Sequence, residues 1–484
     1  MPAFEPVIGL EIHAQLLTDT KIFCGCSTRF GAEPNTALCP VCAGLPGALP
    51  VLNGRAVELA TRAALALGCT VHPASVFARK NYFYPDLPKG YQISQYDKPL
   101  ATEGEVVFTA DGRTVRVGIT RIHMEEDAGK SLHDVPDASR WTHLDFNRSG
   151  VPLIEIVTEP DLRSAADAAE AFSRVREVLV AIGVNDGNME EGSLRCDANV
   201  SVRPVGETAF GVKTELKNLN SFRHVQRALE FEIDRHVRAR EAGTVLQQET
   251  RLYDPAANRT TVMRTKEEAD DYRYFPEPDL PPLVLDAVWV ESIRRTLPEL
   301  PAARRARFVN DYKLPEYDAG VLTQSMALAD YFEKVAATSG NPKAASNWVM
   351  GELTRKLNET KDPIESAPLA PDALAELIAL IDKGTITGPV AKDVFEKMYG
   401  SGRRPGDIVA SEGLARIDDQ SAIDKIVSDV LAGHAATVAE YRAGKTKTFG
   451  FLVGQVMKAT AGKADPARVN DSIRRVLGAP AGTP

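Results

Sequence analysis

The chain has 484 residues, a length that suggests roughly three domains. Hydrophobic residues make up 44% of the sequence and charged residues 25%, which is typical of a globular enzyme and excludes a disordered or fibrous chain. The formal net charge is −9, so the molecule as a whole is not a basic nucleic-acid binder, and any contact with a polyanion must be local.

No segment has the pattern of a membrane span or a secretory leader. The longest stretch without a charged residue, Pro34 to Gly54, contains four prolines, which would break a membrane-spanning helix. The segment from Met1 to Thr20 has no Lys or Arg and no long apolar core. We therefore expect a cytoplasmic protein.

Alternating polarity predicts half-buried strands, mainly antiparallel, in the first 290 residues. Between positions 7 and 17 the even-numbered residues are apolar, whereas Glu11, His13 and Gln15 face the other way. The segment from 193 to 205 alternates in the same manner. Further strands are expected at Arg116–Glu126, Leu153–Thr158 and Val212–Leu216.

Helices are expected within and after these strands. Leu162–Ile182 carries the capping pair Ser164 and Asp167, and the next helix has Ser221 as its N-cap and ends before Gly243. Strand patterns stop at the Pro-rich segment Tyr274–Pro282. The helices expected beyond it are Ala302–Tyr312, Gln324–Ser339, Lys343–Leu357, Pro371–Lys383 and Val390–Tyr399.

These elements predict an α+β fold in three parts. We expect a large, mainly antiparallel β-sheet domain at residues 1–291, a helical linker domain at 292–407 and a small helical tail domain at 408–484. The Gly-, Arg- and Pro-rich segment Gly400–Gly406 is predicted to be the linker before the tail.

The tail has a charge of its own. The last 44 residues carry a net charge of +6, whereas the other 440 carry −15. Attraction for nucleic-acid phosphates is therefore concentrated in the tail. The alternative is that this basicity only solubilises a helical bundle. The candidate phosphate contacts are Lys445, Lys447, Lys458, Arg474 and Arg475.

Four of the six cysteines form two short-spaced pairs, Cys24-Gly-Cys26 and Cys39-Pro-Val-Cys42. Thiolates at such spacings, in a loop rich in Gly and Pro, suit a tetrahedral Zn²⁺. Four thiolates leave no open coordination position, so this zinc would be structural. The alternative is a group of buried free thiols.

Acidic residues recur on the polar faces of the predicted strands. Glu155 interrupts an apolar run, where a lone buried carboxylate would be costly without a partner. Carboxylates and an imidazole that converge across a sheet suit Mg²⁺ when a nucleotide supplies the remaining ligands. A solvated polar face is the alternative. The other candidates are Glu11, His13, the cluster His123-Met-Glu125-Glu126-Asp127, Asp197 and Glu215.

The segment Arg79-Lys80-Asn81-Tyr82-Phe83-Tyr84-Pro85-Asp86 combines cations with three aromatic rings. One interpretation is that Lys80 binds phosphate beside a stacking platform that includes Tyr82. The alternative is an aromatic core strand with solvated flanking charges.

Several catalytic motifs are absent from the sequence. It contains no Gly-x4-Gly-Lys-[Ser/Thr], no His-Glu-x-x-His, no Gly-x-Ser-x-Gly and no Ser-rich glycine loop of the amidase kind. Cys69 and Cys196 have no neighbouring His in the sequence. The chain therefore shows no covalent nucleophile with which to release ammonia or to hydrolyse an amide.

Long segments distributed over essentially the whole chain carry a resemblance to a known family. They are Val7-Ile-Gly-Leu-Glu-Ile-His13, Arg79 to Asp86, His123-Met-Glu-Glu-Asp-Ala-Gly-Lys130, Glu190-Glu-Gly-Ser-Leu-Arg-Cys-Asp-Ala-Asn199, Glu215-Leu-Lys-Asn-Leu-Asn-Ser221, Asp271-Tyr-Arg-Tyr-Phe-Pro-Glu-Pro278 and Gly450-Phe-Leu-Val-Gly-Gln-Val-Met-Lys458. These segments resemble the B-subunit family of the tRNA-dependent amidotransferase.

The resemblance implies a ligase subunit that forms a carbon–nitrogen bond with glutamine as amido donor. ATP would phosphorylate the side-chain carboxylate of glutamate misacylated on tRNA-Gln, or of aspartate on tRNA-Asn. An amidase-type A subunit would supply the ammonia, and a small C subunit would complete a heterotrimer. A partner that makes ammonia agrees with the missing nucleophile.

The family's metal positions fall on residues already singled out. The resemblance implies that His13, Glu126 and Glu155 hold one Mg²⁺, with Glu125 as the alternative to Glu126. A second, transient ion would use Glu11, Asp197 and Glu215. The implied catalytic residues are Glu11, His13, Lys80, Glu126 and Glu155, and the implied nucleotide contacts are Lys80, Tyr82, Arg195 and Lys213.

Two other functions are compatible with parts of the sequence. One is a non-catalytic tRNA-docking scaffold with a structural zinc, although carboxylate faces repel phosphate unless a metal intervenes. The other is a metal-dependent phosphohydrolase. ATP turnover that depends on misacylated tRNA separates the three functions.

Overall fold

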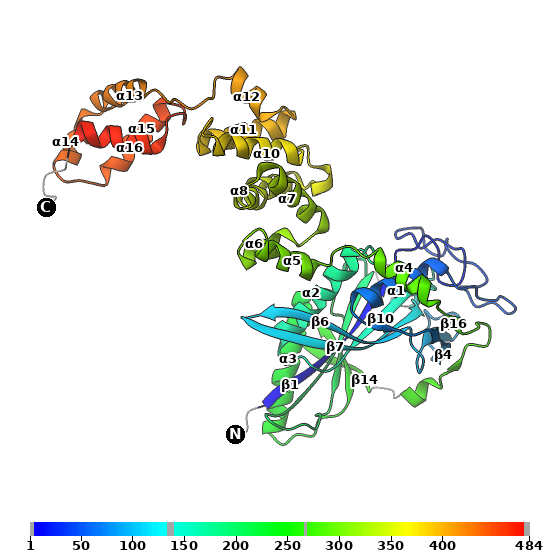
Figure 1. Cartoon of the computed structure of the whole chain (residues 1–484). Helices are drawn as coiled ribbons and strands as arrows, with labels where there is room; N and C mark the ends of the chain where they lie inside the picture. Colours follow the sequence, from blue (N-terminus) through cyan, green and yellow to red (C-terminus); the bar gives the residue numbers. More distant parts are fainter. Residues whose placement is uncertain (1–3, 133–139, 266–268, 479–484) are drawn as a thin grey trace. The chain divides into compact units, whose positions relative to one another are not determined.

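The computed structural model describes residues 4–132, 140–265 and 269–478 (Figure 1). Residues 1–3 of the predicted sheet domain and residues 479–484 of the predicted tail domain lie outside this described part. The chain forms two compact units, residues 1–302 and 303–484. The first unit contains a large, mainly antiparallel sheet and the second is helical, which confirms the α+β prediction. The domain borders at 291/292 and 407/408 remain predictions.

The first unit is built on a nine-stranded sheet. Neighbouring strands are antiparallel except β12 and β13, which are parallel and are connected by helix α3. The predicted strands are all present. In spatial order the strands are β14 (Arg259–Thr265), β13 (Glu249–Asp254), β12 (Thr214–Lys217), β11 (Leu194–Pro204), β1 (Phe4–Gln15), β10 (Pro152–Thr158), β7 (Arg113–Glu126), β6 (Ala101–Ala110) and β2 (Thr70–Val71).

Smaller sheets add segments that are distant in sequence. The strand β15 (Phe275–Pro276) pairs with β4 (Phe77–Asn81), which pairs with β5 (Tyr91–Gln95). This pairing brings the predicted phosphate-binding segment next to residues near position 275. Two-stranded sheets join β3 (Ala74–Ser75) to β16 (Leu283–Val284) and β8 (Lys130–Leu132) to β9 (His143–Asp145); a 3₁₀ turn, η1, spans Ala269–Tyr272.

Helices α1 (Gly54–Ala66), α2 (Ala165–Ala181) and α3 (Phe222–Glu241) pack on one face of the large sheet (Figure 1). The predicted caps are confirmed, because the hydroxyl oxygens of Ser164 and Ser221 accept hydrogen bonds from backbone N–H groups in the first turns. Helix α1 was not expected from the sequence. Asn53 caps it, and its Ala-rich face is buried.

The register of the sheet determines which side chains lie together on the face that the helices do not cover. The apolar residues Ile8, Leu10 and Ile12 of β1 point into the core with the helices, so the polar residues between them point away from it. Opposite neighbours in adjacent strands lie on the same face. These pairs are His13 with Glu155, Glu155 with His123, Glu11 with Asp197, and Asn199 with Glu215.

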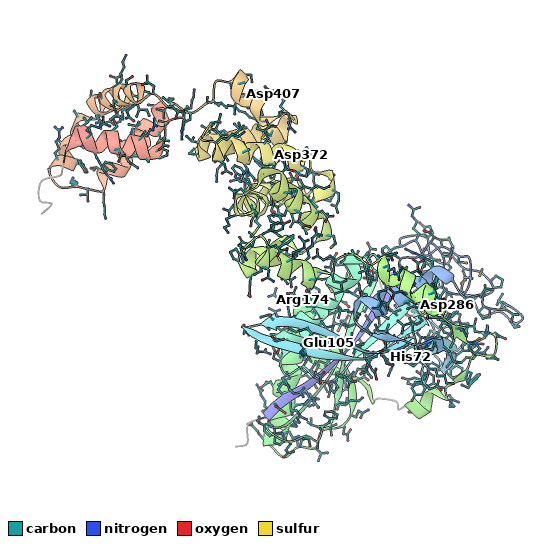
Figure 2. All side chains as sticks on the ribbon, in the orientation of Figure 1. His72, Glu105, Arg174, Asp286, Asp372 and Asp407 are labelled. Atoms are coloured by element: carbon teal, nitrogen blue, oxygen red, sulfur yellow. The ribbon has the colours of Figure 1, made fainter. Side chains whose placement is uncertain are left out.

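Helices follow the sheet from α4 (Ala287–Arg295), which is capped by Asp286 (Figure 2). Four of the five predicted helices are confirmed to within two residues at each end, and a π-helical turn divides the one expected at 343–357. The elements are α5 (Pro301–Asn310), α6 (Glu316–Leu322), α7 (Met326–Ser339), α8 (Pro342–Trp348), the π-helix η2 (Val349–Leu353), α9 (Thr354–Thr360), the 3₁₀ turn η3 (Ile364–Ser366), α10 (Pro371–Asp382), α11 (Gly388–Ser401) and α12 (Pro405–Ser411).

The second unit has two separate hydrophobic cores. Helix α11 continues to Ser401 and α12 begins at Pro405, so most of the predicted linker is helical. Ile408 and Val409 are buried in the core of the preceding helices, and the segment between the two cores follows α12. The last core is formed by α13 (Gln420–Gly433), α14 (Ala435–Arg442), α15 (Thr448–Ala459) and α16 (Pro466–Leu477).

Within residues 4–132, 140–265 and 269–478, every helix is too short or too polar to cross a bilayer.

Candidate active site

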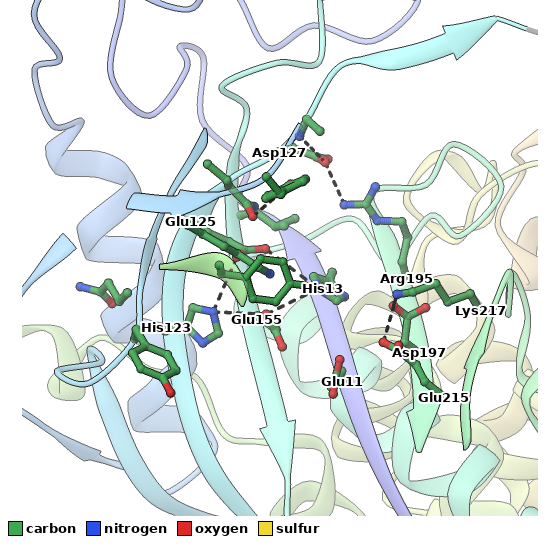
Figure 3. A pocket seen from close by; sticks show the side chains of 18 of the residues that line it. Glu11, His13, His123, Glu125, Asp127, Glu155, Arg195, Asp197, Glu215 and Lys217 are labelled. Carbon is green, nitrogen blue, oxygen red and sulfur yellow. Dashed lines mark hydrogen bonds and ion pairs between the residues drawn. The ribbon is translucent and has the colours of Figure 1, made fainter. Parts of the chain in front are cut away.

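A cavity of about 580 Å³ lies on the sheet face opposite the helices (Figure 3). Side chains from β1, β10, β7, β11 and β12 form its floor, and aromatic residues near β4 and β15 form part of its wall. It contains most of the residues singled out in the sequence. Those that line it are Glu11, His13, Lys80, Tyr82, Tyr84, Asp86, His123, Glu125, Asp127, Glu155, Arg195, Asp197, Lys213 and Glu215.

One group of possible metal ligands consists of His13, Glu125 and Glu155, here called the first triad. One ligand atom from each residue lies within 4.8 Å of the others. The imidazole Nε2 of His13 is 3.7 Å from a carboxylate oxygen of Glu155 and 4.0 Å from one of Glu125. Both carboxylates are buried.

A second imidazole, that of His123, contacts both carboxylates of the first triad. His123 is buried, and its Nε2 is 3.2 Å from Glu155 and 3.6 Å from Glu125. Burial disfavours the imidazolium, but the two carboxylates raise the pKa of His123 to about 9. Burial would likewise raise the pKa of Glu155, yet the charges of His123, His13 and Lys80 hold it well below its usual range. Both carboxylates are therefore ionised near neutral pH.

Glu126, which the family resemblance implied as a ligand, does not join the first triad. It points to the opposite side of β7, where its carboxylate forms an ion pair with buried Lys89 and accepts a hydrogen bond from the backbone N–H of Ile93, at 2.8 Å. Strand alternation explains the difference, because Glu125 is two residues from His123 and so shares its face. The structure thus places Glu125, the alternative, at the position expected for Glu126.

The second triad consists of Glu11, Asp197 and Glu215. These residues come from the adjacent strands β1, β11 and β12, and one ligand atom from each lies within 4.8 Å of the others. The side-chain amide of Asn199 donates to Glu11 at 2.8 Å, and the hydroxyl of Thr250 donates to Glu215 at 2.8 Å. The sheet therefore brings all three predicted carboxylates together.

A lysine bridges two members of the second triad. The ammonium of Lys217 is 2.5 Å from Asp197 Oδ2 and 3.2 Å from Glu215 Oε1 (Figure 3). Burial lowers the pKa of an ammonium, but the two carboxylates more than offset this and raise the pKa of Lys217. The group is therefore a permanent cation in this environment.

Lys80 lies on the aromatic side of the cavity. Its ammonium is 4.9 Å from the ring centre of Tyr272 and 5.8 Å from that of Tyr82. Burial lowers its pKa, but Tyr274, Glu125 and Glu155 raise it above the ordinary value. Lys80 thus presents a fixed positive charge to the cavity, on the same side as the rings.

Arg195 contacts a carboxylate at the cavity rim. Its guanidinium donates to Asp127 at 3.0 Å, and Gln15 donates to the same carboxylate at 2.8 Å. Burial would raise the pKa of Asp127, but Arg148 and Arg195 lower it. These contacts hold in place the loop that follows β7, the strand that carries Glu125.

The four cysteines Cys24, Cys26, Cys39 and Cys42 converge as expected, with all sulfur atoms within 4.8 Å of one another. The backbone N–H of Cys39 donates to Cys42 Sγ at 3.2 Å, and the ammonium of Lys21 lies 3.5 Å from the same sulfur. Hydrogen bonding with Cys24 lowers the pKa of Cys42 to about 4. A thiolate held in this way suits a closed four-sulfur metal site.

The ligands of the first triad are suited to Mg²⁺. Two buried carboxylates and an imidazole are hard ligands that leave coordination positions for phosphate oxygens, as Mg²⁺ requires. In the described part of the chain the ion-pair partners of Glu125 and Glu155 are the imidazoles of His13 and His123, and neither carboxylate forms an ion pair with a Lys or Arg. The first triad therefore fits a divalent cation.

The predicted phosphate contacts of the tail lie on its last helices and the turn before them. All five side chains, those of Lys445, Lys447, Lys458, Arg474 and Arg475, are exposed. Arg474 also lies 5.5 Å from the ring of Phe449, and Arg475 pairs with Asp424 at 3.1 Å.

The sequence did not identify several residues of the cavity as functional. Lys217 follows Glu215 by two positions, so period-two spacing was a readable signal for it. Asn199 shares a face with Asp197 for the same reason. The aromatic residues Tyr272 and Tyr274 carried no such signal, because the pairing of β15 with β4 is non-local.

Comparisons with known proteins cover nearly the whole chain. The family model described as the GatB/GatE catalytic domain matches residues 6–291, and the one described as the GatB domain matches residues 330–477. The chain is also similar to proteins that are named as B subunits of the aspartyl/glutamyl-tRNA(Asn/Gln) amidotransferase.

Three such relatives come from different bacteria. The protein of Geotalea daltonii is 56% identical over 475 residues, which cover 98% of this chain and 99% of the relative. The protein of Geobacter sulfurreducens is 55% identical over 475 residues, with the same coverage. The protein of Caldanaerobacter subterraneus is 54% identical over 474 residues, again covering 98% and 99%.

Proposed function

This chain belongs to the family of aspartyl/glutamyl-tRNA(Asn/Gln) amidotransferase B subunits, and we propose that its cavity uses ATP to activate a side-chain carboxylate. The substrates would be glutamate misacylated on tRNA-Gln, aspartate misacylated on tRNA-Asn, or both. The observation that carries the proposal is the convergence of two acidic triads with Lys80 in one cavity.

Activation is needed because ammonia does not displace oxygen from a carboxylate. An oxygen of the side-chain carboxylate would attack the γ-phosphorus of ATP, and ADP would leave. Ammonia would then attack the acyl carbon of the acyl phosphate and expel inorganic phosphate, which leaves the amide. The protein's contribution to such phosphoryl transfer is positioning and charge neutralisation.

The residues of the cavity divide these tasks. His13, Glu125 and Glu155 would hold one Mg²⁺, and Glu11, Asp197 and Glu215 would hold a second. When bound, Mg²⁺ would neutralise phosphate charge and orient the phosphate oxygens. Lys80 faces the same space as a fixed cation, and Arg195 and Lys213 line it as further positive charges.

A second hollow beside the triads suits the adenine of ATP. Its volume is about 280 Å³, and it shares Glu11 and Lys213 with the main cavity. Its lining is mostly apolar and includes Gly9, Leu10 and Val157. An aromatic ring, Phe210, stands at its edge and is exposed. A planar base fits such a hollow, with its phosphates directed toward the second triad.

Asn199 adds a polar contact suited to adenine. Its amide Nδ2 donates to Glu11, which fixes the orientation of the amide because a carboxylate only accepts. Its Oδ1 is buried and has no hydrogen-bond partner within the described residues. The exocyclic amine of adenine is a donor that would satisfy this oxygen, whereas the corresponding oxygen of guanine would not.

The missing nucleophile and the basic tail define the proposed partners. An amidase-type A subunit would supply ammonia from glutamine, and a small C subunit would complete the heterotrimer. The tail would bind the phosphates of tRNA, which fixes position rather than sequence. We also propose a cytoplasmic location, where aminoacyl-tRNA is made and used.

The test is an amidation assay with the A and C subunits present. Glu-tRNA(Gln) and Asp-tRNA(Asn) are supplied separately with ATP and glutamine. We expect ADP formation that requires a misacylated tRNA and amide formed on at least one of them. ATP turnover independent of tRNA would instead indicate a phosphohydrolase, and tRNA binding without ATP turnover would indicate a scaffold.

The tail is tested by replacing Lys445, Lys447 and Lys458 with alanine. Each lost phosphate contact should lower the slope of log affinity against log salt by about 0.7–0.9. Tail variants that bind tRNA with unchanged affinity and salt slope would contradict a role in tRNA binding.

A further inference from the structure

The ammonium of Lys217 occupies the space in the second triad where a metal ion would bind. It is the last residue of β12, and its ammonium lies between Asp197 and Glu215. Those two carboxylates belong to the group whose ligand atoms lie within 4.8 Å of one another. A divalent cation bound by the same oxygen atoms would occupy the same space as the ammonium.

An ammonium and a metal cannot share these ligands. The ammonium has three donors and no lone pair, so it satisfies carboxylates but cannot coordinate a metal. Its positive charge also repels a cation at close range, and this repulsion is strong in a partly buried site. A metal can therefore enter the second triad only after Lys217 has moved away.

Lys217 has somewhere to move. Its side chain is 29% exposed and lines the main cavity of about 580 Å³. When the cavity contains no anion, Lys217 would lose its two ion pairs by moving away from Asp197 and Glu215 and would gain no new one. A nucleotide would change this balance, because its phosphates would give the displaced ammonium a new partner.

We propose that Lys217 is a built-in counter-ion that withholds the second triad from divalent cations until a nucleotide arrives. The ammonium moves from Asp197 and Glu215 to a nucleotide phosphate, and a cation takes its former place. The nucleotide and the second cation therefore bind cooperatively, each raising the affinity for the other. This inference rests on the proposed nucleotide site, and it adds an order of binding that the established family assignment does not contain.

The experiment counts bound Mn²⁺ on the full-length chain by electron paramagnetic resonance, with Mn²⁺ replacing Mg²⁺. No tRNA and no glutamine are present, and the probe nucleotide is a non-hydrolysable ATP analogue. The wild-type chain should bind one Mn²⁺ alone and a second only with the analogue. The thiolate site does not interfere, because sulfur ligands favour zinc over manganese.

The decisive variant is Lys217→Met, which keeps the length of the side chain and removes its charge. It should bind the second Mn²⁺ without nucleotide, at least about tenfold more tightly than the wild type does, and should lose most of the cooperativity. Lys217→Arg keeps the charge and should behave like the wild type. The unchanged first Mn²⁺ serves in every sample as a measure of correct folding.

A second variant locates the additional ion. Lys217→Met combined with Asp197→Asn should return the count to one Mn²⁺ per chain. A wild-type chain that binds both ions without nucleotide, or a Lys217→Met chain that binds only one, would overturn the proposal. Because the count requires no amidation, a failed amidation assay with the expected Mn²⁺ counts would contradict only the proposed reaction.

Discussion

The two triads lie on neighbouring strands of one sheet face, yet different groups balance their negative charge. In the first, the carboxylates of Glu125 and Glu155 face the imidazoles of His13 and His123. In the second, Asp197 and Glu215 hold the ammonium of Lys217. An imidazole can coordinate a metal once it has lost its proton, whereas the ammonium of Lys217 must leave its carboxylates before a metal binds there. Similar ligand atoms can therefore form one ready cation site and one guarded site.

The largest expected effect comes from the first triad. Glu125→Gln or Glu155→Gln should each lower ATP-dependent amidation by at least about a thousandfold, because a group that stabilises transition-state charge is lost. His13→Ala should behave similarly. The rate of amide formation on misacylated tRNA measures the effect, with glutaminase activity of the partner subunit as the control. Amidation at the normal rate by these variants would refute the assignment of the first triad.

The neighbouring residue Glu126 provides a matched comparison. Glu126→Gln leaves the ammonium of Lys89 buried without its charge partner, which should lower the free energy of unfolding by about 3–5 kcal/mol. Folded molecules of this variant should still bind the first Mn²⁺ with normal affinity. Urea unfolding and Mn²⁺ titration measure the two quantities. Loss of the first Mn²⁺ site in folded Glu126→Gln protein would show that Glu126, and not only Glu125, serves the cation.

Glu232, a buried carboxylate on the helix-covered side of the sheet, should contribute to folding stability but not to cation binding. Burial would raise the pKa of Glu232, but hydrogen bonds from His236 and Arg235 lower it to about 2. Since the unfolded pKa is about 4.3, ionised Glu232 stabilises the fold by on the order of 3 kcal/mol above that pH. This contribution is lost as the pH falls from about 4.3 toward 2.

The measurement compares the wild type with Glu232→Gln by urea unfolding at several pH values. The difference in unfolding free energy should be largest near neutral pH and should shrink as the pH falls below about 4.3. Mn²⁺ binding at both triads should be unchanged at neutral pH. A difference that does not depend on pH would mean that the charge of Glu232 contributes nothing to stability.

The smallest effect on chemistry is expected at the cysteines. Cys42→Ser should lower the zinc content of the purified protein and its thermal stability, while the amidation rate per folded molecule stays the same. A closed thiolate site has no coordination position for a substrate, which is the reason for this separation. Elemental analysis before and after chelation gives the zinc content. Protein purified without chelators that contains no zinc would favour the alternative of free thiols.

Local patterns in the sequence predicted the parts of the molecule that depend on local interactions. The alternation around Glu11 and His13 identified β1, the hydroxyl caps Ser164 and Ser221 identified two helix starts, and the cysteine spacing identified a cluster that the fold assembles. The polar face of β1 was visible in the sequence for the same reason.

The remaining features depend on pairing between distant segments. Choosing Glu125 over Glu126 required the register in which His123 lies opposite Glu155. Placing Tyr272 beside Lys80 required the pairing of β15 with β4. Helix α1 was missed for a different reason, since its small apolar residues directly follow a Pro- and Gly-rich loop.

The central claim is that this cavity transfers a phosphoryl group from ATP to a side-chain carboxylate. The most direct measurement uses misacylated tRNA whose side-chain carboxylate carries ¹⁸O, with ATP, glutamine and the partner subunits. Displacement of an acyl phosphate by ammonia leaves one carboxylate oxygen in the released phosphate. We predict inorganic phosphate that contains one ¹⁸O for each amide formed. Amide formation with unlabelled phosphate would contradict the claim.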